Sequence, residues 1–316
     1  MNAIARKANV KDTAVRAASS SKASHATGSH GGSTHGGHTH NGNSLSRKDF
    51  ERLGKFIHSY SGIKMPPNKL TMVEGRLRRR LKATGHATFA QYCRYLFDED
   101  GLEDETVHLI DAVTTNKTEF FREPDHFRIL EDSILDTVVH ERRSRKPVKV
   151  WSAASSIGAE PYTLAMVLAD YADRNRGFDY SILATDLCTQ VLETAVLGIY
   201  PDAMLAPVPD PLYQRYVLRD KDPKRGLARI VPELRAQVQF ARLNLMDAAY
   251  PLDADFDIVF CRNILIYFDK PTQNAVLQRL CSHIRPGGYL FMGHSETLAG
   301  FDLPLTLAGP TVFRRN

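Results

Sequence analysis

The stretch Lys149–Pro161, KVWSAASSIGAEP, combines a strand, a loop of small residues and the start of a helix. Val148–Ser152 has the length and apolar content of a buried strand, and a helical pattern begins at Glu160. The residues between them are almost all small, so the backbone can approach a ligand closely while helix-terminal amides point into the same space. We therefore predict a ligand-binding loop beyond the carboxyl end of a strand.

Strand-like and helical segments alternate from this stretch to the end of the chain. The further strand-like runs are Tyr180–Thr185, Val238–Arg242, Asp257–Cys261 and Tyr289–Met292, with Thr311–Arg315 as a candidate for a last, antiparallel strand. This alternation is typical of an α/β fold with a doubly wound, mostly parallel sheet, which we assign to 148–316. The alternation breaks at 199–237, where prolines, a short helix and a hairpin signal near Lys224–Gly226 indicate a small β insertion.

Residues 45–125 show only helical periodicity, with Ser46 as a cap for the first helix. We predict an all-α N-terminal domain there and a linker helix at 126–147. Residues 1–44 are rich in Ser, Gly, Thr, Ala and His and contain no aromatic residue, so we predict a disordered low-complexity tail. The five histidines of the tail fit a solvated segment better than a specific site, and we predict no metal site.

Composition and charge limit the class of protein. The 316 residues are 43% hydrophobic and 24% charged, which is typical of a globular protein. Most of the net charge of +5 lies in the tail, so bulk charge gives no reason to expect a nucleic-acid partner. No run approaches the roughly 20 apolar residues of a membrane span, the N-terminus lacks a secretory core, and the four cysteines lack CxxC spacing. We expect a cytoplasmic monomer without direct membrane insertion.

Polar residues at the ends of the other predicted strands indicate one shared ligand. Asp186 ends the second strand, where an acid suits the two ribose hydroxyls of a nucleoside. Asn244 and Leu245 follow the third strand and can border an adenine ring, while Arg262 and Asn263 follow the fourth. All these loops share one edge of the sheet. A nucleotide-dependent dehydrogenase would fit this geometry, but its G-x-G-x-x-G pattern is absent.

Over residues 45–316 the sequence resembles the CheR-type chemotaxis receptor methyltransferases. The motifs that carry the resemblance are VTTNKTEFFREPDHF at 113–127, VWSAASSIGAEPY at 150–162, LATD at 183–186, FCRNILIYFD at 260–269 and LFMGHSE at 290–296. The resemblance implies an S-adenosylmethionine-dependent protein-glutamate O-methyltransferase. Such an enzyme converts glutamate side chains of chemoreceptors into methyl esters for chemotactic adaptation and releases S-adenosylhomocysteine.

The resemblance also implies roles for single residues. The implied cofactor-binding residues are Asn116, Thr118, Arg122, Glu160, Asp186, Asn244, Leu245, Arg262 and Asn263. Arg122 and Tyr267 would be catalytic, with Arg122 bound to the carboxylate of either the substrate or the cofactor. The family often has an acid where this chain has Ala159, whereas Glu160, the acid used for the cofactor, is present. We assign His294 a structural hydrogen bond, because transfer to an ionised carboxylate needs no base.

A basic segment bears on the substrate. Residues 64–82 carry seven Lys and Arg residues against one Glu, and the family uses this second helix for substrate contact. The implied substrate-binding residues are Arg76, Arg78, Arg79 and Arg80, facing the cytoplasmic helices of chemoreceptors. Docking of a receptor's C-terminal peptide on 199–237 stays open. Two other functions also stay open: a non-catalytic regulator that senses S-adenosylmethionine, and a methyltransferase for another substrate.

Overall fold

The computed structural model describes residues 44–142, 147–252 and 255–316. The predicted tail lies outside these ranges, apart from Ser44. Within them, no helix is both long enough and apolar enough to cross a bilayer. All four cysteines are buried, and none forms a disulfide.

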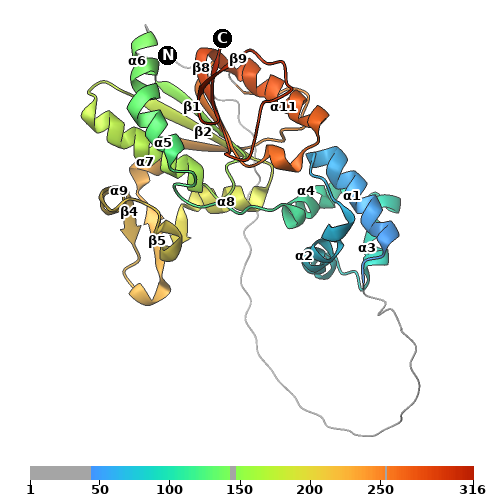
Figure 1. Ribbon diagram of the computed structural model, residues 1–316. Coiled ribbons are helices and arrows are strands. Elements are labelled where there is room, and N and C mark those ends of the chain that lie inside the picture. Colours follow the sequence, from blue (N-terminus) through green and yellow to red (C-terminus); the bar gives the residue numbers. More distant parts are fainter. Residues whose placement is uncertain (1–43, 143–146, 253–254) are drawn as a thin grey trace, which may run out of the picture. The chain divides into compact units, whose positions relative to one another are not determined.

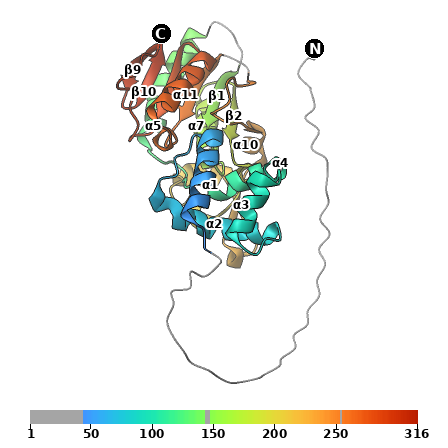
Figure 2. The same ribbon diagram turned by 90° about the vertical axis from the view of Figure 1, so that its right-hand side faces the viewer.

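The N-terminal part is a bundle of helices (Figure 2). Its elements are α1 (Arg47–Ser61), the 3-10 turn η1 (Pro67–Lys69), α2 (Leu70–Ala83), α3 (Phe89–Asp98) and α4 (Leu102–Val113). The Ser46 hydroxyl caps α1, and Gly62 ends it with a left-handed φ of 73°. Leu53 and Ile57 of α1 are fully buried in the bundle core, at the helical spacing expected of an inward face. The predicted all-α domain is confirmed.

The predicted linker helix packs on the sheet. It consists of α5 (Asp125–Ile129), a π-helical turn η2 (Leu130–Ile134) and α6 (Leu135–Glu141). Phe127, Leu130 and Leu135 are buried in one core with Val150 of the first strand. We predicted 126–147 as a linker between domains; the structure makes this helix a layer of the α/β domain, because its apolar stripe packs against the sheet.

The α/β domain is built on a seven-stranded sheet (Figure 1). Its strands are β1 (Val148–Ala153), β2 (Tyr180–Asp186), β6 (Val238–Arg242), β7 (Phe256–Cys261), β8 (Ile284–Met292), β9 (Leu305–Gly309) and β10 (Val312–Arg315). Their order is β6-β2-β1-β7-β8-β10-β9, and β10 is antiparallel to both its neighbours while the other pairs are parallel. The predicted doubly wound, mostly parallel sheet is confirmed. The sequence analysis missed β9, an edge strand with mostly exposed residues.

Helices cover both faces of this sheet. The helices between strands include α7 (Ala159–Arg174), α8 (Thr189–Leu197) and α11 (Lys270–His283). Val150 and Phe260 lie in the core covered by α7 and the α5–α6 helix. Their strand neighbours Trp151 and Val259 point to the other face and lie in the core with Leu277 of α11. Because both faces are buried, the strands are nearly continuous apolar runs, which explains why they were recognisable in the sequence.

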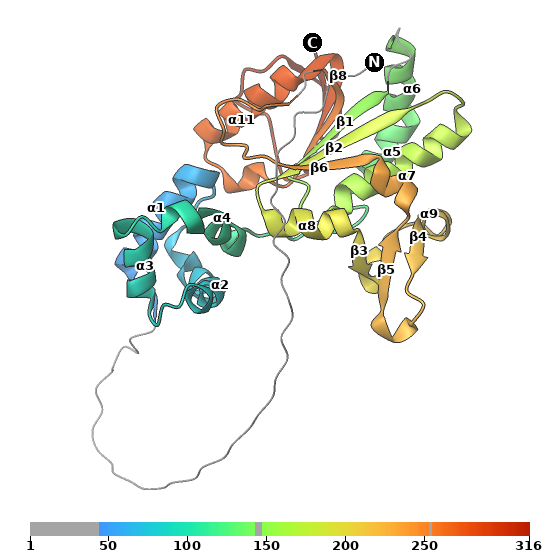
Figure 3. The same cartoon turned by 180° about the vertical axis from the view of Figure 1, so that it is seen from behind.

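The insertion at 199–237 folds as a three-stranded antiparallel sheet with short helices (Figure 3). Its strands are β3 (Ile199–Pro201), β4 (Val217–Arg219) and β5 (Leu227–Ile230), in the order β3-β5-β4. Its helical elements are η3 (Asp202–Leu205), α9 (Asp210–Tyr216), η4 (Pro223–Arg225) and α10 (Pro232–Ala236). The predicted hairpin is confirmed, and β3 is an additional strand.

One edge of the main sheet collects the loops that can bind a ligand. The carboxyl ends of β1, β2, β6 and β7 meet there, because parallel neighbours end on the same side. The loop after β1 leads into α7, and the segment after β7 contains the 3-10 turn η5 (Leu265–Tyr267).

Candidate active site

A cavity of about 280 Å³ lies at this edge, with loops of the α/β domain on one side and helical-domain residues such as Ile63 and Met72 on the other. Residues singled out in the sequence that line it are Asn116, Thr118, Arg122, Glu160, Asp186, Asn244, Leu245, Arg262, Asn263 and Tyr267. The structure therefore brings every predicted cofactor-binding and catalytic residue to one cavity. Cavities of roughly this size bind small organic ligands.

The loop between β1 and α7 has an unusual backbone. Ala154 and Ser156 have positive φ angles of 62° and 51°, and Gly158 at the helix start has a φ of 91°. A residue with a side chain adopts this region at a cost of about 1–2 kcal/mol, and such strain gathers at ligand sites. Between them the Ser155 hydroxyl is buried and has no hydrogen-bond partner among the described residues. A ligand in the cavity would supply that partner, because Ser155 lines it.

Asp186 ends β2 and has only 9% of its surface exposed. One carboxylate oxygen accepts the Ser156 amide at 2.8 Å, and the other accepts the Cys188 amide at 2.9 Å. Burial raises the pKa of Asp186, although the two amides act in the opposite direction. An ionised carboxylate can accept about four hydrogen bonds, so each oxygen has room for one more donor. This arrangement suits two neighbouring hydroxyls.

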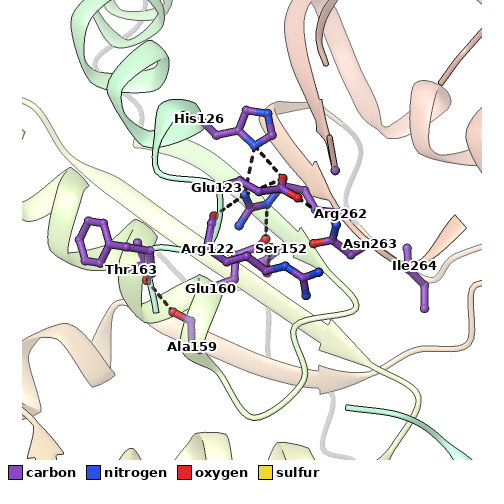
Figure 4. A network of polar contacts seen from close by, with 12 residues as sticks. Arg122, Glu123, His126, Ser152, Ala159, Glu160, Thr163, Arg262, Asn263 and Ile264 are labelled. Carbon is purple, nitrogen blue, oxygen red and sulfur yellow. Dashed lines mark hydrogen bonds and ion pairs between the residues drawn. The ribbon is translucent and has the colours of Figure 1, made fainter. Parts of the chain in front are cut away.

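Glu160 at the start of α7 and Arg262 beyond β7 form a buried ion pair (Figure 4). Arg262 Nε donates to one Glu160 oxygen at 2.7 Å, and the Ser152 hydroxyl donates to the other at 2.7 Å. Only 2% of the Arg262 side chain is exposed, and its Nη1 donates to the Arg122 carbonyl at 2.8 Å. Arg262 thereby fixes Glu160 and the backbone of Arg122 in addition to lining the cavity.

Glu123, His126 and His294 offer three potential metal ligands within 4.8 Å of one another. The Arg262 guanidinium occupies the same place, since its Nη1 lies 3.1 Å from His126 Nδ1 and 3.4 Å from a Glu123 oxygen. A metal ion there would be in contact with the positive charge of Arg262 and would be repelled by it. The geometry therefore supports a hydrogen-bonded cluster of these side chains with Arg262. Burial, followed by the charge of Arg262, lowers the pKa of His126 to about 4, which keeps the ring neutral near pH 7.

The helical domain supplies the other wall. Asn244 Nδ2 donates to the carbonyl of Tyr60 in α1 at 2.7 Å, and the Lys64 amide donates to the Tyr267 carbonyl at 3.2 Å. A carboxylate of α4, Asp111, accepts two hydrogen bonds from the first residue of α8. A ligand in the cavity therefore contacts both domains.

Arg122 and Tyr267, the predicted catalytic residues, are both partly exposed to the cavity. Arg122 Nη1 donates to the Lys117 carbonyl at 3.3 Å, which leaves most of its five N–H donors available. The Asn116 carbonyl accepts the Ser156 hydroxyl at 3.0 Å and so attaches this segment to the loop after β1. The guanidinium is placed to bind a carboxylate inside the cavity.

The four arginines of α2 do not line the cavity, and they divide into two pairs. Arg76 donates to two backbone carbonyls at the end of α4, at 2.6 and 2.8 Å, and Arg80 makes two 2.7 Å hydrogen bonds to the buried Glu105. Arg78 and Arg79 are exposed. We predicted all four as substrate ligands; because Arg76 and Arg80 lie one helical turn apart on the side facing α4, they hold the bundle together instead.

Comparison with known proteins identifies the two domains. Residues 48–114 match the family model described as "CheR methyltransferase, all-alpha domain", and residues 116–312 match "CheR methyltransferase, SAM binding domain". The chain belongs to the CheR methyltransferase family. The boundary between the two matches falls before the linker helix, in agreement with the packing of that helix on the sheet.

Relatives of this CheR-family chain carry matching names. The "Chemotaxis protein methyltransferase" of Escherichia coli K12 is 40% identical over 270 residues, which cover 85% of this chain and 91% of the relative. The protein of that name from Klebsiella aerogenes is 41% identical over 269 residues, or 85% and 90% of the two chains. "Chemotaxis protein methyltransferase 2" of Pseudomonas aeruginosa is 38% identical over 270 residues, or 85% and 93%.

S-adenosylmethionine is the cofactor of this domain, and the CheR cavity fits its parts. Asp186 has two acceptor positions left for the ribose hydroxyls, and the partnerless Ser155 hydroxyl lies beside it. The apolar side chain of Leu245 can border the adenine, and Arg122 has donors left for a carboxylate. The residues that are present therefore agree with the cofactor that the family model names.

Four residues around this CheR site escaped the sequence analysis: Ser155, Glu123, His126 and Glu296. The sequence holds one signal for Glu296, since it is an acid three residues after a glycine at a strand end. The role predicted for this motif was instead given to the nearby His294. The His294 ring is exposed, and its backbone amide donates to Glu123 at 3.3 Å, so the structural bond we predicted belongs to the main chain.

Proposed function

We propose that this chain transfers the methyl group of S-adenosylmethionine to glutamate side chains of chemoreceptors and so forms methyl esters. Three relatives are named chemotaxis protein methyltransferases and match both domains. The observation that carries the proposal is that Arg122 and Tyr267 line the same cavity as the cofactor residues. A regulator that only sensed the cofactor would not need a residue such as Tyr267 to orient an acceptor oxygen in that cavity.

The proposed acceptor needs no general base. A glutamate side chain has a reference pKa of about 4.3, so it is already ionised at neutral pH. The bound cofactor supplies an electrophilic methyl group on a sulfonium. The chain must hold one carboxylate oxygen at roughly 3 Å from that carbon, in line with the bond that breaks. His126, the buried histidine nearest the site, is held by Arg262 behind the cavity wall, in agreement with chemistry that needs no base.

Arg122 and Tyr267 are the residues we propose for positioning. The Arg122 guanidinium can bind a carboxylate through two parallel hydrogen bonds, either from the substrate or from the cofactor. The Tyr267 hydroxyl can orient the acceptor oxygen, because the Tyr267 backbone is fixed by the Lys64 amide.

The exposed side of α2 is the surface we propose for the receptor. Arg78 and Arg79 are exposed there, and Lys69 and Lys82 at the two ends of the helix are exposed as well. Chemoreceptor methylation sites lie on helices rich in acidic residues, so opposite charge would bring the acceptor to the cavity. Lys69, which directly precedes α2, also lines the cavity.

The test is a transfer assay with methyl-labelled S-adenosylmethionine and receptor-containing membranes. We expect base-labile label on receptor bands, as methyl esters hydrolyse in alkali. Arg122→Ala should abolish the label, whereas Arg128→Ala, a change at an exposed arginine outside the cavity, should keep it. Cofactor binding by calorimetry with no label on any receptor would instead support the regulator, and label on another acceptor would support a different methyltransferase.

A further inference from the structure

Glu296, in the loop after β8, is a buried carboxylate that holds four backbone amides. One oxygen accepts the amides of Gly293 at 2.7 Å and Asn263 at 3.0 Å, and the other accepts those of Ile264 at 3.0 Å and Leu265 at 2.8 Å. We infer that Glu296 is a positioning residue for methyl transfer, acting through the segment 262–268 of the cavity wall. This inference rests on the proposed function.

The segment that Glu296 holds contributes a large part of the cavity. Its lining residues are Arg262, Asn263, Ile264, Ile266, Tyr267 and Phe268. Three consecutive amides of this segment, from Asn263 to Leu265, end on the one carboxylate. They turn the chain from the end of β7 into η5, and η5 carries Tyr267. Movement of these amides would therefore move Asn263 and Tyr267 together.

The turn between β7 and η5 has an unusual backbone. Asn263 has a φ of 59°, in the left-handed region that few residues other than glycine, asparagine and aspartate adopt. Gly293 has to lie against it, since an added Cβ would be 2.4 Å from Asn263 Nδ2 and 2.9 Å from its backbone nitrogen. Hydrogen bonds to a charged acceptor are stronger than those between neutral groups, so the Glu296 carboxylate stabilises this turn.

Four backbone amides stabilise the charge of the Glu296 carboxylate. Only 7% of the residue is exposed, and burial raises the pKa of its carboxyl group while the four amides oppose that shift. A glutamine here would present an NH₂ group to two N–H donors, so half of the bonds would be lost. Glu296 is not among the lining residues of the cavity, which separates its role from contact with the ligand.

The experiment compares Glu296→Gln with Asp257→Asn. Asp257 is also a fully buried carboxylate that accepts a backbone amide, but it lies at the opposite end of β7. Both variants should lose stability in urea. We expect only Glu296→Gln to weaken S-adenosylmethionine binding in calorimetry, on the order of 10-fold, and to lower kcat on the order of 100-fold with the receptor KM unchanged, as misplacement by about 1 Å predicts.

Two further variants keep the inference falsifiable if Glu296→Gln does not fold. Gly293→Ala leaves the carboxylate in place but pushes on Asn263, and Glu296→Asp keeps the charge but shortens its reach. Either should give the same loss of affinity and kcat. Affinity and kcat within about threefold of the wild type in a folded variant, or equal losses in Asp257→Asn, would overturn the inference. Calorimetry needs no acceptor, so it decides even if the wild type labels no receptor and the proposed function fails.

Discussion

Two buried aspartates at opposite edges of the main sheet are held in different ways. Asp257, at the start of β7, accepts the Lys149 amide at 2.8 Å and forms ion pairs with Arg142 and Arg285. Asp186, at the end of β2, accepts backbone amides, and no cation pairs with it among the described residues. The comparison teaches that Asp257, neutralised by arginines, is complete within the protein, whereas Asp186, whose carboxylate accepts the two amides and whose side chain lies at the cavity, still has room for donors from a ligand.

The largest expected effect is a loss of stability on substitution of Asp257, which lies at the end of the strands away from the cavity. Asp257→Asn leaves two arginines partly buried without their partner, which should cost about 3–5 kcal/mol of unfolding free energy. Urea denaturation measures this loss, and calorimetry should show unchanged affinity for S-adenosylmethionine. A loss of cofactor affinity with an unchanged unfolding free energy would contradict the purely structural role of Asp257.

For Asp186, at the cavity, we expect the reverse: a large loss of cofactor affinity and a smaller loss of stability. If Asp186 binds both ribose hydroxyls as we propose, Asp186→Asn removes the charge from two hydrogen bonds, at about 2 kcal/mol each, so the Kd should rise on the order of 1000-fold. Its unfolding free energy should fall by less than that of Asp257→Asn, because no ion pair is broken. Calorimetry and urea denaturation of the same sample measure both quantities; a stability loss as large as in Asp257→Asn would contradict the assignment.

The ligand edge should also respond to pH through His126. Its folded pKa of about 4 lies below the ordinary histidine value of about 6.5, so its contribution to stability is present above pH 6.5 and lost as the pH falls towards 4. The loss amounts to roughly 3 kcal/mol. Burial is the largest cause of the lowered pKa; the charges of Arg262 and His294 add to it, and Glu123 opposes it.

His126→Gln should flatten the stability profile between pH 6.5 and 4, as measured by urea denaturation at each pH. Titration of the ring by NMR gives an independent check, and a normal pKa in the folded protein would rule out the explanation.

The smallest effect should come from the exposed side of α2. Arg79→Glu should raise the receptor KM several-fold, or about 1 kcal/mol, and leave the Kd for S-adenosylmethionine unchanged. Arg176→Glu, the same change at an exposed position after α7, is the control. Equal losses in receptor KM and cofactor affinity would contradict a separate substrate surface.

The sequence predicted most of the fold because its signals were local or periodic. The buried strands and the cap at Ser46 could be predicted without knowledge of distant contacts. The ten cavity residues were found through strand ends and motifs. The roles of Arg76 and Glu296 could not be found in this way. Arg76 donates to Val113, 37 residues away, and three of the amides held by Glu296 belong to residues 31, 32 and 33 positions away, whereas residue spacing shows only local contacts. The exposed edge strand β9 lacks the apolar pattern that marks the others.

Gly62 has a consequence for protein engineering. A Cβ at this position would lie 2.7 Å from Met246 Sδ and 2.9 Å from the Phe268 ring, so any side chain there acts as a wedge between the bundle and the cavity. Residue 62 therefore lies where the helical domain contacts the α/β domain. A bulky substitution at this one position would push on Met246 and Phe268, and Phe268 lines the cavity, so it offers a single position at which to disturb the contact between the bundle and the cavity wall.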